Sequence, residues 1–140
     1  MNTITGTGKD VLVEARNRAH PNCFVCNLAN PKGLHVKYVL SDNGEEVTVS
    51  FWCDKKYEGF SGAVHGGVIS SILDGAMCNC LFAHGKTAVT VEITIRIRHP
   101  VVVCRMATVS ARITRYVHSL LSRYKSNSSS CLLESVLIVL

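Results

Sequence analysis

The sequence predicts an α+β domain in which one long apolar helix packs against a curved antiparallel sheet. Two observations support this class. Residues 67–82 are apolar on most of the circumference of a predicted helix, and a helix of that kind is normally buried. Segments on both sides of it alternate apolar and polar residues and are joined by short turns, which favours antiparallel pairing. One helix on one sheet is an α+β arrangement.

Length and composition fit one globular domain over residues 1–140. The chain has 47% hydrophobic and 18% charged residues, which excludes a disordered polypeptide. Its most apolar stretch, 59–85, contains Asp74, so no uncharged run reaches the roughly 18–20 residues of a membrane helix. The N-terminus lacks the basic-then-apolar order of a secretory signal. We therefore expect a cytoplasmic protein with no membrane partner.

The net charge of +5 permits an anionic ligand but does not indicate nucleic acid. The basic residues do not form one run, and aromatic residues, which could stack on bases, make up only 6% of the chain. Arginines between 96 and 115 alternate along predicted strands. They fit either an anion site or a solvated sheet face.

The N-terminal part, residues 1–33, is expected to hold one helix and one loop. Asp10–Ala19 forms an amphipathic pattern that starts at an N-cap residue type and stops before His20-Pro21. The following segment, PNCFVCNLANPKG, is dense in Asn, Pro and Gly, which is typical of a loop.

Two strands and the long helix come next. Leu34–Leu40 and Glu46–Cys53 alternate around SDNG, a strong hairpin signal. The helix is expected to extend from Gly67 to Phe82, and Gly85 suits its C-cap.

Further strands are expected after the helix. Thr87–Arg98 has the clearest period-two pattern, with Val and Ile on one face and Thr, Glu and Arg on the other, and Pro100 ends it. Val101–Val117 reads as another long strand. The tail, 118–140, is atypical: it is serine-rich and then strongly apolar, and Ser119–Lys125 and Cys131–Leu140 could form a closing hairpin.

The seven cysteines are odd in number and irregularly spaced, which favours free thiols in a reducing compartment. Cys23 and Cys26 form a CxxC with His20 three residues upstream. This could be half of a zinc site, but a structural zinc site needs four ligands, and no second CxxC or HxxxH follows. We therefore expect free thiols and no metal.

Asp74 is the one charged residue of the apolar helix. Burying a lone carboxylate costs several kcal/mol or leads to its protonation. Either Asp74 is capped by neighbouring hydroxyls, or it faces a cavity where its charge is used. Ser70 and Ser71, one turn earlier, and Cys78, one turn later, share its face of the helix.

The start of this helix suits a developing negative charge. It follows His65 and opens with Gly66 and Gly67, so free backbone N–H groups lie at its positive end. A carbonyl oxygen that gains charge during acyl transfer would be stabilised there. Asp74 lies about 10 Å further along the axis. The alternative is that the two glycines only make a tight entry.

The motifs resemble a known family. EGFSGAVHGGVISSILDGAM followed by TAVTVEITIRIRHPV, with CFVCNLANPKGLHV upstream, is similar to the hotdog-fold acyl-CoA thioesterases of the phenylacetate-degradation and 4-hydroxybenzoyl-CoA thioesterase superfamily. The resemblance covers roughly residues 22–117. It implies the hotdog fold, a homodimer or homotetramer, and an active site at the subunit interface.

The resemblance also implies roles for residues. Gly67 would polarise the thioester carbonyl through its N–H, His65 would shape that turn, and Asp74 would be the general base or the nucleophile. The reaction would be hydrolysis of an acyl-CoA to a free acid and CoA, with no cofactor. Some relatives carry Asn or Gln at the position of Gly59; the adjacent Glu58 could substitute.

The expected substrate contacts extend beyond these residues. Gly66, Ser70 and Ser71 line the same face, while Arg96 and Arg98 are candidates for the phosphates of CoA. Glu92, where some relatives carry Ser or Thr, would approach Asp74 from the partner subunit or pair with an arginine. The alternative function is a non-catalytic acyl-CoA-binding module, a sensor or scaffold. A hydratase is weaker, because the expected paired His and acid are not evident.

Overall fold

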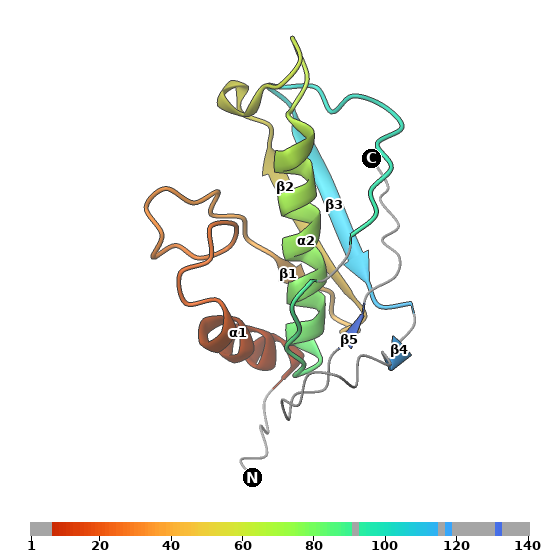
Figure 1. The fold of residues 1–140 in the computed structure, drawn as a ribbon. Helices are drawn as coiled ribbons and strands as arrows, with labels where there is room; N and C mark the ends of the chain where they lie inside the picture. Colours follow the sequence, from red (N-terminus) through yellow and green to blue (C-terminus); the bar gives the residue numbers. More distant parts are fainter. Residues whose placement is uncertain (1–6, 91–92, 115–116, 119–130, 133–140) are drawn as a thin grey trace, which may run out of the picture.

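The structure, a computed structural model, confirms the α+β class: a long helix packs on one face of an antiparallel sheet and runs along its strands (Figure 1). It describes residues 7–90, 93–114, 117–118 and 131–132.

The described sheet has three strands in the order β1-β2-β3, all antiparallel. β1 (Val39–Leu40) pairs with β2 (Glu46–Trp52), and β2 pairs with β3 (Met106–Arg112). One face is apolar and buried, as the period-two pattern predicts; its members are Val47, Val49, Phe51, Val109 and Ala111. A turn that ends at Gly44, whose φ of 75° suits glycine, joins β1 to β2.

The apolar sheet face packs on α2 (Gly66–Ala83). Leu73 and Ala76 of this helix are fully buried. α2 is long and apolar enough to cross a membrane, yet 61% of that stretch is buried within the fold, which is the position of a core helix. Gly85 follows its end with a φ of 66°, and its N–H donates to the Phe82 carbonyl, in agreement with the expected C-terminal glycine.

α1 (Gly8–Ala19) packs beside α2 and begins two residues before the expected Asp10. Thr7 is the N-cap, and the Asp10 carboxylate accepts hydrogen bonds from the Thr7 N–H at 3.1 Å and from its hydroxyl at 2.7 Å. The acid therefore stabilises the first turn from inside the helix. Leu12 and Ala15 are buried against the core.

The first predicted strand is shorter than expected. Of Leu34–Leu40, only the last two residues pair with β2. The reason is a competing set of hydrogen bonds: the N–H groups of Leu34 and Val36 donate to the carbonyls of Phe24 and Val25 in the preceding loop, at 2.7 and 2.8 Å. This holds the loop beside α2.

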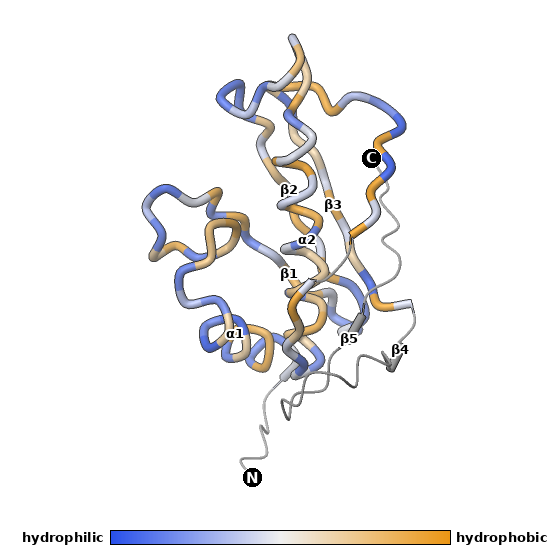
Figure 2. The backbone as a smooth tube through the Cα atoms, viewed as in Figure 1, coloured by the Kyte–Doolittle hydropathy of each residue, from blue (hydrophilic) through white to orange (hydrophobic). Residues whose placement is uncertain are grey.

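The strand predicted for Thr87–Arg98 is absent from the described residues of that range. Alternation defines two faces, but a strand also needs hydrogen bonds to a neighbouring strand, and the described residues of this range form none within the described sheet. The apolar face is consequently open: Val89 is 85% exposed, Ile93 37% and Ile97 43%. Figure 2 shows alternating hydropathy along residues 93–98, where the chain returns toward the N-terminal end of α2.

The next predicted strand, Val101–Val117, is also interrupted. β3 forms its centre, with the expected inward alternation. Cys104, with a φ of 59°, breaks the strand before β3. Of the predicted closing hairpin, β4 (Val117–His118) pairs with β5 (Cys131–Leu132); residues 119–130 and 133–140 lie outside the described part.

One close contact fixes the loop on α2. The Tyr38 hydroxyl donates to the Ile72 carbonyl at 2.6 Å. A Cβ on Gly75 would overlap the Tyr38 hydroxyl oxygen and would lie 3.1 Å from Val25 Cγ1. Only glycine leaves room for this approach.

We predict that Gly75→Ala lowers the free energy of unfolding by about 1–3 kcal/mol, because overpacking outweighs the better helix propensity of alanine. Denaturant unfolding measures it. The matched control is Gly66→Ala in the same helix, where a Cβ meets nothing nearer than Ile97 Cδ1 at 3.7 Å. Equal stabilities of the two variants would contradict the close approach.

Candidate functional site

Asp74 lies in the middle of α2 at the border of the core. Its carboxylate is half-buried, whereas the adjacent Leu73 and Gly75 are buried. The hydroxyl of Thr90, from the segment after α2, donates to Asp74 Oδ1 at 2.5 Å. Partial exposure and this hydrogen bond reduce the cost of placing a carboxylate on an apolar helix. The carboxylate therefore faces the rim of the core.

Thr90 was not predicted as a partner of Asp74. The residue expected to approach Asp74 was Glu92, which lies outside the described residues. The signal was present, because Thr90 shares the polar face of the alternating segment with Glu92. Contact between residues 16 positions apart depends on the path of the chain after α2, which alternation does not specify.

The serines beside Asp74 do not reach it. Ser70 Oγ donates to the Gly66 carbonyl and Ser71 Oγ to the Gly67 carbonyl, each at 2.8 Å. This is the usual bond of a helical serine to the carbonyl four residues earlier. Neither serine caps Asp74; the hydroxyl that does so is that of Thr90. The two serines remain on the same side of the first helical turns.

The helix start differs from the expectation in one respect. The Gly67 N–H, the expected donor to a substrate carbonyl, donates instead to Nδ1 of the N-cap residue His65 at 2.9 Å. His65 thus shapes the turn, as expected, but occupies the donor. The Gly66 N–H has no acceptor among the hydrogen bonds of the described residues. Since His65 is exposed, a change of its rotamer would also release the Gly67 N–H.

The loop before α2 explains the glycine at 59. A Cβ there would lie 3.0 Å from His65 Cα, so a side chain would disturb the N-cap. Glu58 does not replace the missing amide: its Oε1 accepts the Gly62 N–H at 2.6 Å and closes the loop, with Gly62 at a φ of 79°.

Arg96 and Arg98 are exposed, and neither forms an ion pair within the described part of the chain. Between them, Ile97 lies 3.7 Å from the position of a Cβ on Gly66. The segment that carries both arginines thus passes the N-terminal end of α2.

Two neutral groups neighbour Asp74. Burial, reinforced by the Asp74 charge, raises the pKa of Cys78 to about 11. The same charge favours protonated His20, but burial outweighs it and lowers the pKa of that imidazole. Cys78 Sγ lies 4.0 Å from Thr90 Oγ1. At neutral pH Cys78 is therefore a thiol and a poor nucleophile.

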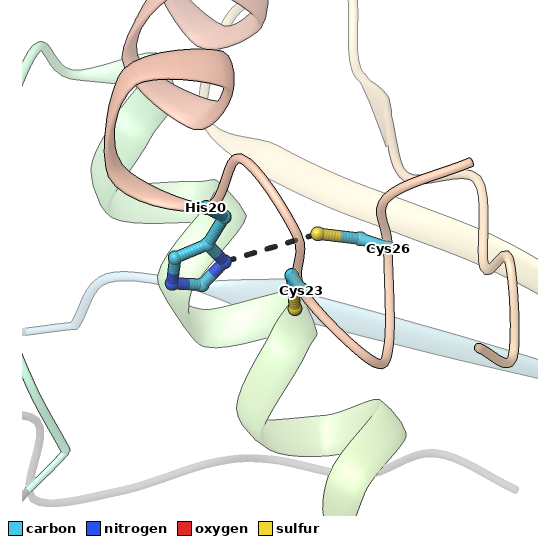
Figure 3. A group of neighbouring side chains, drawn as sticks. All are labelled: His20, Cys23 and Cys26. Carbon is cyan, nitrogen blue, oxygen red and sulfur yellow. Dashed lines mark hydrogen bonds between the residues drawn. The ribbon is translucent and has the colours of Figure 1, made fainter. Parts of the chain in front are cut away.

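A second cluster lies at the end of α1. Figure 3 shows His20, Cys23 and Cys26 gathered beside α2. Their ligand-type atoms are within 4.8 Å of one another.

Comparison with known proteins agrees with this architecture. The thioesterase superfamily model matches residues 61–121, from the loop before α2 past β3. A solved thioesterase superfamily protein is 23% identical with a TM-score of 0.60, over 65% of this chain and 47% of that one. The E. coli PaaI protein from the phenylacetic acid degradation operon is 19% identical, with a TM-score of 0.58 over 76% of this chain and 75% of that one.

Thioesterase superfamily member 2 from Mus musculus is 17% identical, with a TM-score of 0.54 over 82% of this chain and 77% of that one. No curated protein sequence matches. The chain spans about half the length of the first of these structures. Together the matches confirm the resemblance to the thioesterase superfamily and identify the fold as the hotdog fold.

We predict that Cys78 resists alkylation at pH 8 in the folded protein, whereas the exposed Cys104 reacts. A pKa of about 11 leaves roughly one thiol in a thousand ionised at that pH. Mass spectrometry after a short iodoacetamide pulse gives the modified fraction at each site, and unfolded protein is the control. Modification of Cys78 as fast as Cys104 would make Cys78 a competing nucleophile.

Proposed function

We propose that the protein hydrolyses an acyl-CoA thioester to a free acid and CoA, with Asp74 at the reacting centre. The observation that carries this proposal is the half-exposed Asp74 carboxylate on the core helix, held by Thr90. A charged group in that position is otherwise a cost to the fold. The match of residues 61–121 to the thioesterase superfamily model supports the same class of reaction.

The proposed chemistry needs only water and this chain's residues. The carboxylate removes a proton from water, and the oxygen attacks the thioester carbonyl carbon. The C–S bond then breaks, and CoA leaves as a thiolate that takes up a proton. Direct attack by Asp74 would give an anhydride that water then cleaves. In either case Thr90 holds Oδ1, so Oδ2 is the oxygen left to react.

The oxyanion would bind at the start of α2. Gly66 N–H is a candidate donor, and Gly67 N–H becomes a second one when His65 turns away. Both donors lie at the positive end of the helix. Substrate binding would thus change the His65 rotamer.

A second copy of the chain is part of the proposal. In the segment after α2, the apolar side chains of Val89, Ile93 and Ile97 are exposed to solvent. Exposed apolar side chains along an alternating segment indicate a surface that another chain covers. Pairing two copies there would cover it and place the partner beside Asp74, in a homodimer or a homotetramer. We further propose a cytoplasmic location, which suits thiols kept reduced.

The alternative function is an acyl-CoA-binding module without catalysis. One observation favours it: the Gly67 N–H is already bonded to His65. Asp74 favours the enzyme, because a binding cleft needs no carboxylate there.

We predict that Asp74→Asn lowers kcat by at least about a hundredfold while the fold persists, because the amide cannot act as a base. Thiol release from acyl-CoA gives kcat, and circular dichroism checks the fold. Asp42→Asn, at a carboxylate that is 99% exposed, is the matched control and should keep wild-type kcat. Near-normal turnover by a folded Asn variant would remove Asp74 from the mechanism.

We predict that Arg96→Ala and Arg98→Ala raise KM for acyl-CoA about two- to fivefold each with little change in kcat. Exposed ion pairs contribute about 0.5–1 kcal/mol, and phosphate contacts hold substrate and transition state alike. An acyl thioester without the nucleotide should show unchanged KM. Arg112→Ala, on β3, is the control. Equal shifts for both substrates, or for neither, would exclude a phosphate contact.

A further inference from the structure

We propose that His20, Cys23 and Cys26 form a zinc site that joins the end of α1 and the following loop to α2. Their three ligand-type atoms lie within 4.8 Å of one another (Figure 3). The sequence alone favours free thiols, because no second CxxC or HxxxH follows. The structure adds to the CxxC a histidine that faces it and a partner from α2.

The spacing of the atoms suits a tetrahedral ion. Zn–S and Zn–N bonds of about 2.3 and 2.0 Å put neighbouring ligands roughly 3.5–3.8 Å apart. Cys26 Sγ and His20 Nδ1 are 3.8 Å apart. The most widely separated pair of these three atoms needs to approach by only about 1 Å for all three to reach bonding distance of one zinc ion.

Hydrogen bonds already hold the loop in this shape. Asn27 Nδ2 donates to the His20 carbonyl at 2.8 Å, and the Asn27 N–H donates to the Cys23 carbonyl at 3.1 Å. The Val25 N–H donates to Cys23 Sγ at 3.4 Å. A backbone N–H aimed at sulfur stabilises the thiolate form that a metal requires.

Asn79 supplies the independent observation. It is fully buried on α2, and its side-chain amide neighbours Cys26. Nδ2 donates to the Gly75 carbonyl at 2.8 Å, while Oδ1 has no partner in the described part of the protein. A buried unpaired carbonyl oxygen costs about 1–3 kcal/mol. A zinc-bound water that reached this oxygen would donate to it and remove that cost.

The competing use of a CxxC is thiol–disulfide exchange. That reaction needs no histidine at ligand distance, whereas His20 Nδ1 lies 3.8 Å from Cys26 Sγ. Cys26 is also buried, which hinders attack on it by an outside thiolate. Half-exposed His20 and Cys23 leave an entry path for the ion.

The zinc site would hold the end of α1 and the following loop against α2, beside the candidate active site. The ring of His20 packs edge-on against Phe82 of α2, with centroids 4.9 Å apart. Val25 and Tyr38 contact the helix at Gly75, next to Asp74. Zinc would fix this loop on the helix without taking part in thioester chemistry, so the inference does not depend on the proposed function.

The test begins with metal analysis of the full chain, expressed with zinc and purified without chelator. We expect about one zinc per chain in the wild type. Cys23→Ser and Cys26→Ser should lose most of it, whereas Cys104→Ser, at an exposed thiol outside the cluster, should retain it. A chelator should lower the Tm of the wild type.

Titrating metal-stripped wild-type protein with cobalt(II) keeps the test decisive if a serine variant does not fold. Thiolate-to-cobalt charge-transfer absorption that saturates at one equivalent supports the site. Wild type without zinc and without that absorption would overturn it. So would unchanged zinc in a folded Cys26→Ser variant, or a Cys23–Cys26 disulfide as the main form in protein isolated from a reducing cytoplasm.

Discussion

The burial of α2 is the constraint on which the rest of this structure depends. The sheet covers one side of the helix, and α1 and the loop before β1 cover another, so each polar atom on it needs a partner or an opening. The serines bond to their own helix, and Tyr38 satisfies the Ile72 carbonyl. Two side chains remain, Asp74 and Asn79. They mark two places where a polar side chain of the helix interrupts its apolar packing.

Asp74 and Asn79 both lie on α2, but their surroundings differ in chemistry. Asp74 stands at an exposed rim beside Thr90, where a charged oxygen can act on water. Asn79 lies one turn further along, fully buried against the Cys26 loop, where a neutral oxygen can only accept a hydrogen bond. A metal at the loop would keep Tyr38 and Val25 against Gly75, the residue after Asp74. Packing around the reacting centre would then depend on a site that performs no catalysis.

Sequence reasoning predicted what local periodicity determines. Apolar spacing identified α2, β2 and the inward face of β3, and a charge within an apolar helix identified Asp74. It failed where the outcome depends on a neighbour. Thr87–Arg98 alternates well but has no paired strand in the described structure, and the Gly67 N–H depends on one rotamer of His65. Thr90 and Asn79 gained their importance from contacts that no spacing encodes.

The central claim is that the rim of α2 at Asp74 turns over thioesters, and the most direct measurement is thiol release by the wild-type protein. A panel of short, medium, long and aromatic acyl-CoAs, followed optically beside a protein-free control, covers the substrate class. The account predicts catalytic release of free CoA, with many turnovers per chain, from at least one member. Saturable binding of acyl-CoA with no release above the control from any member would contradict it and leave the binding module as the function.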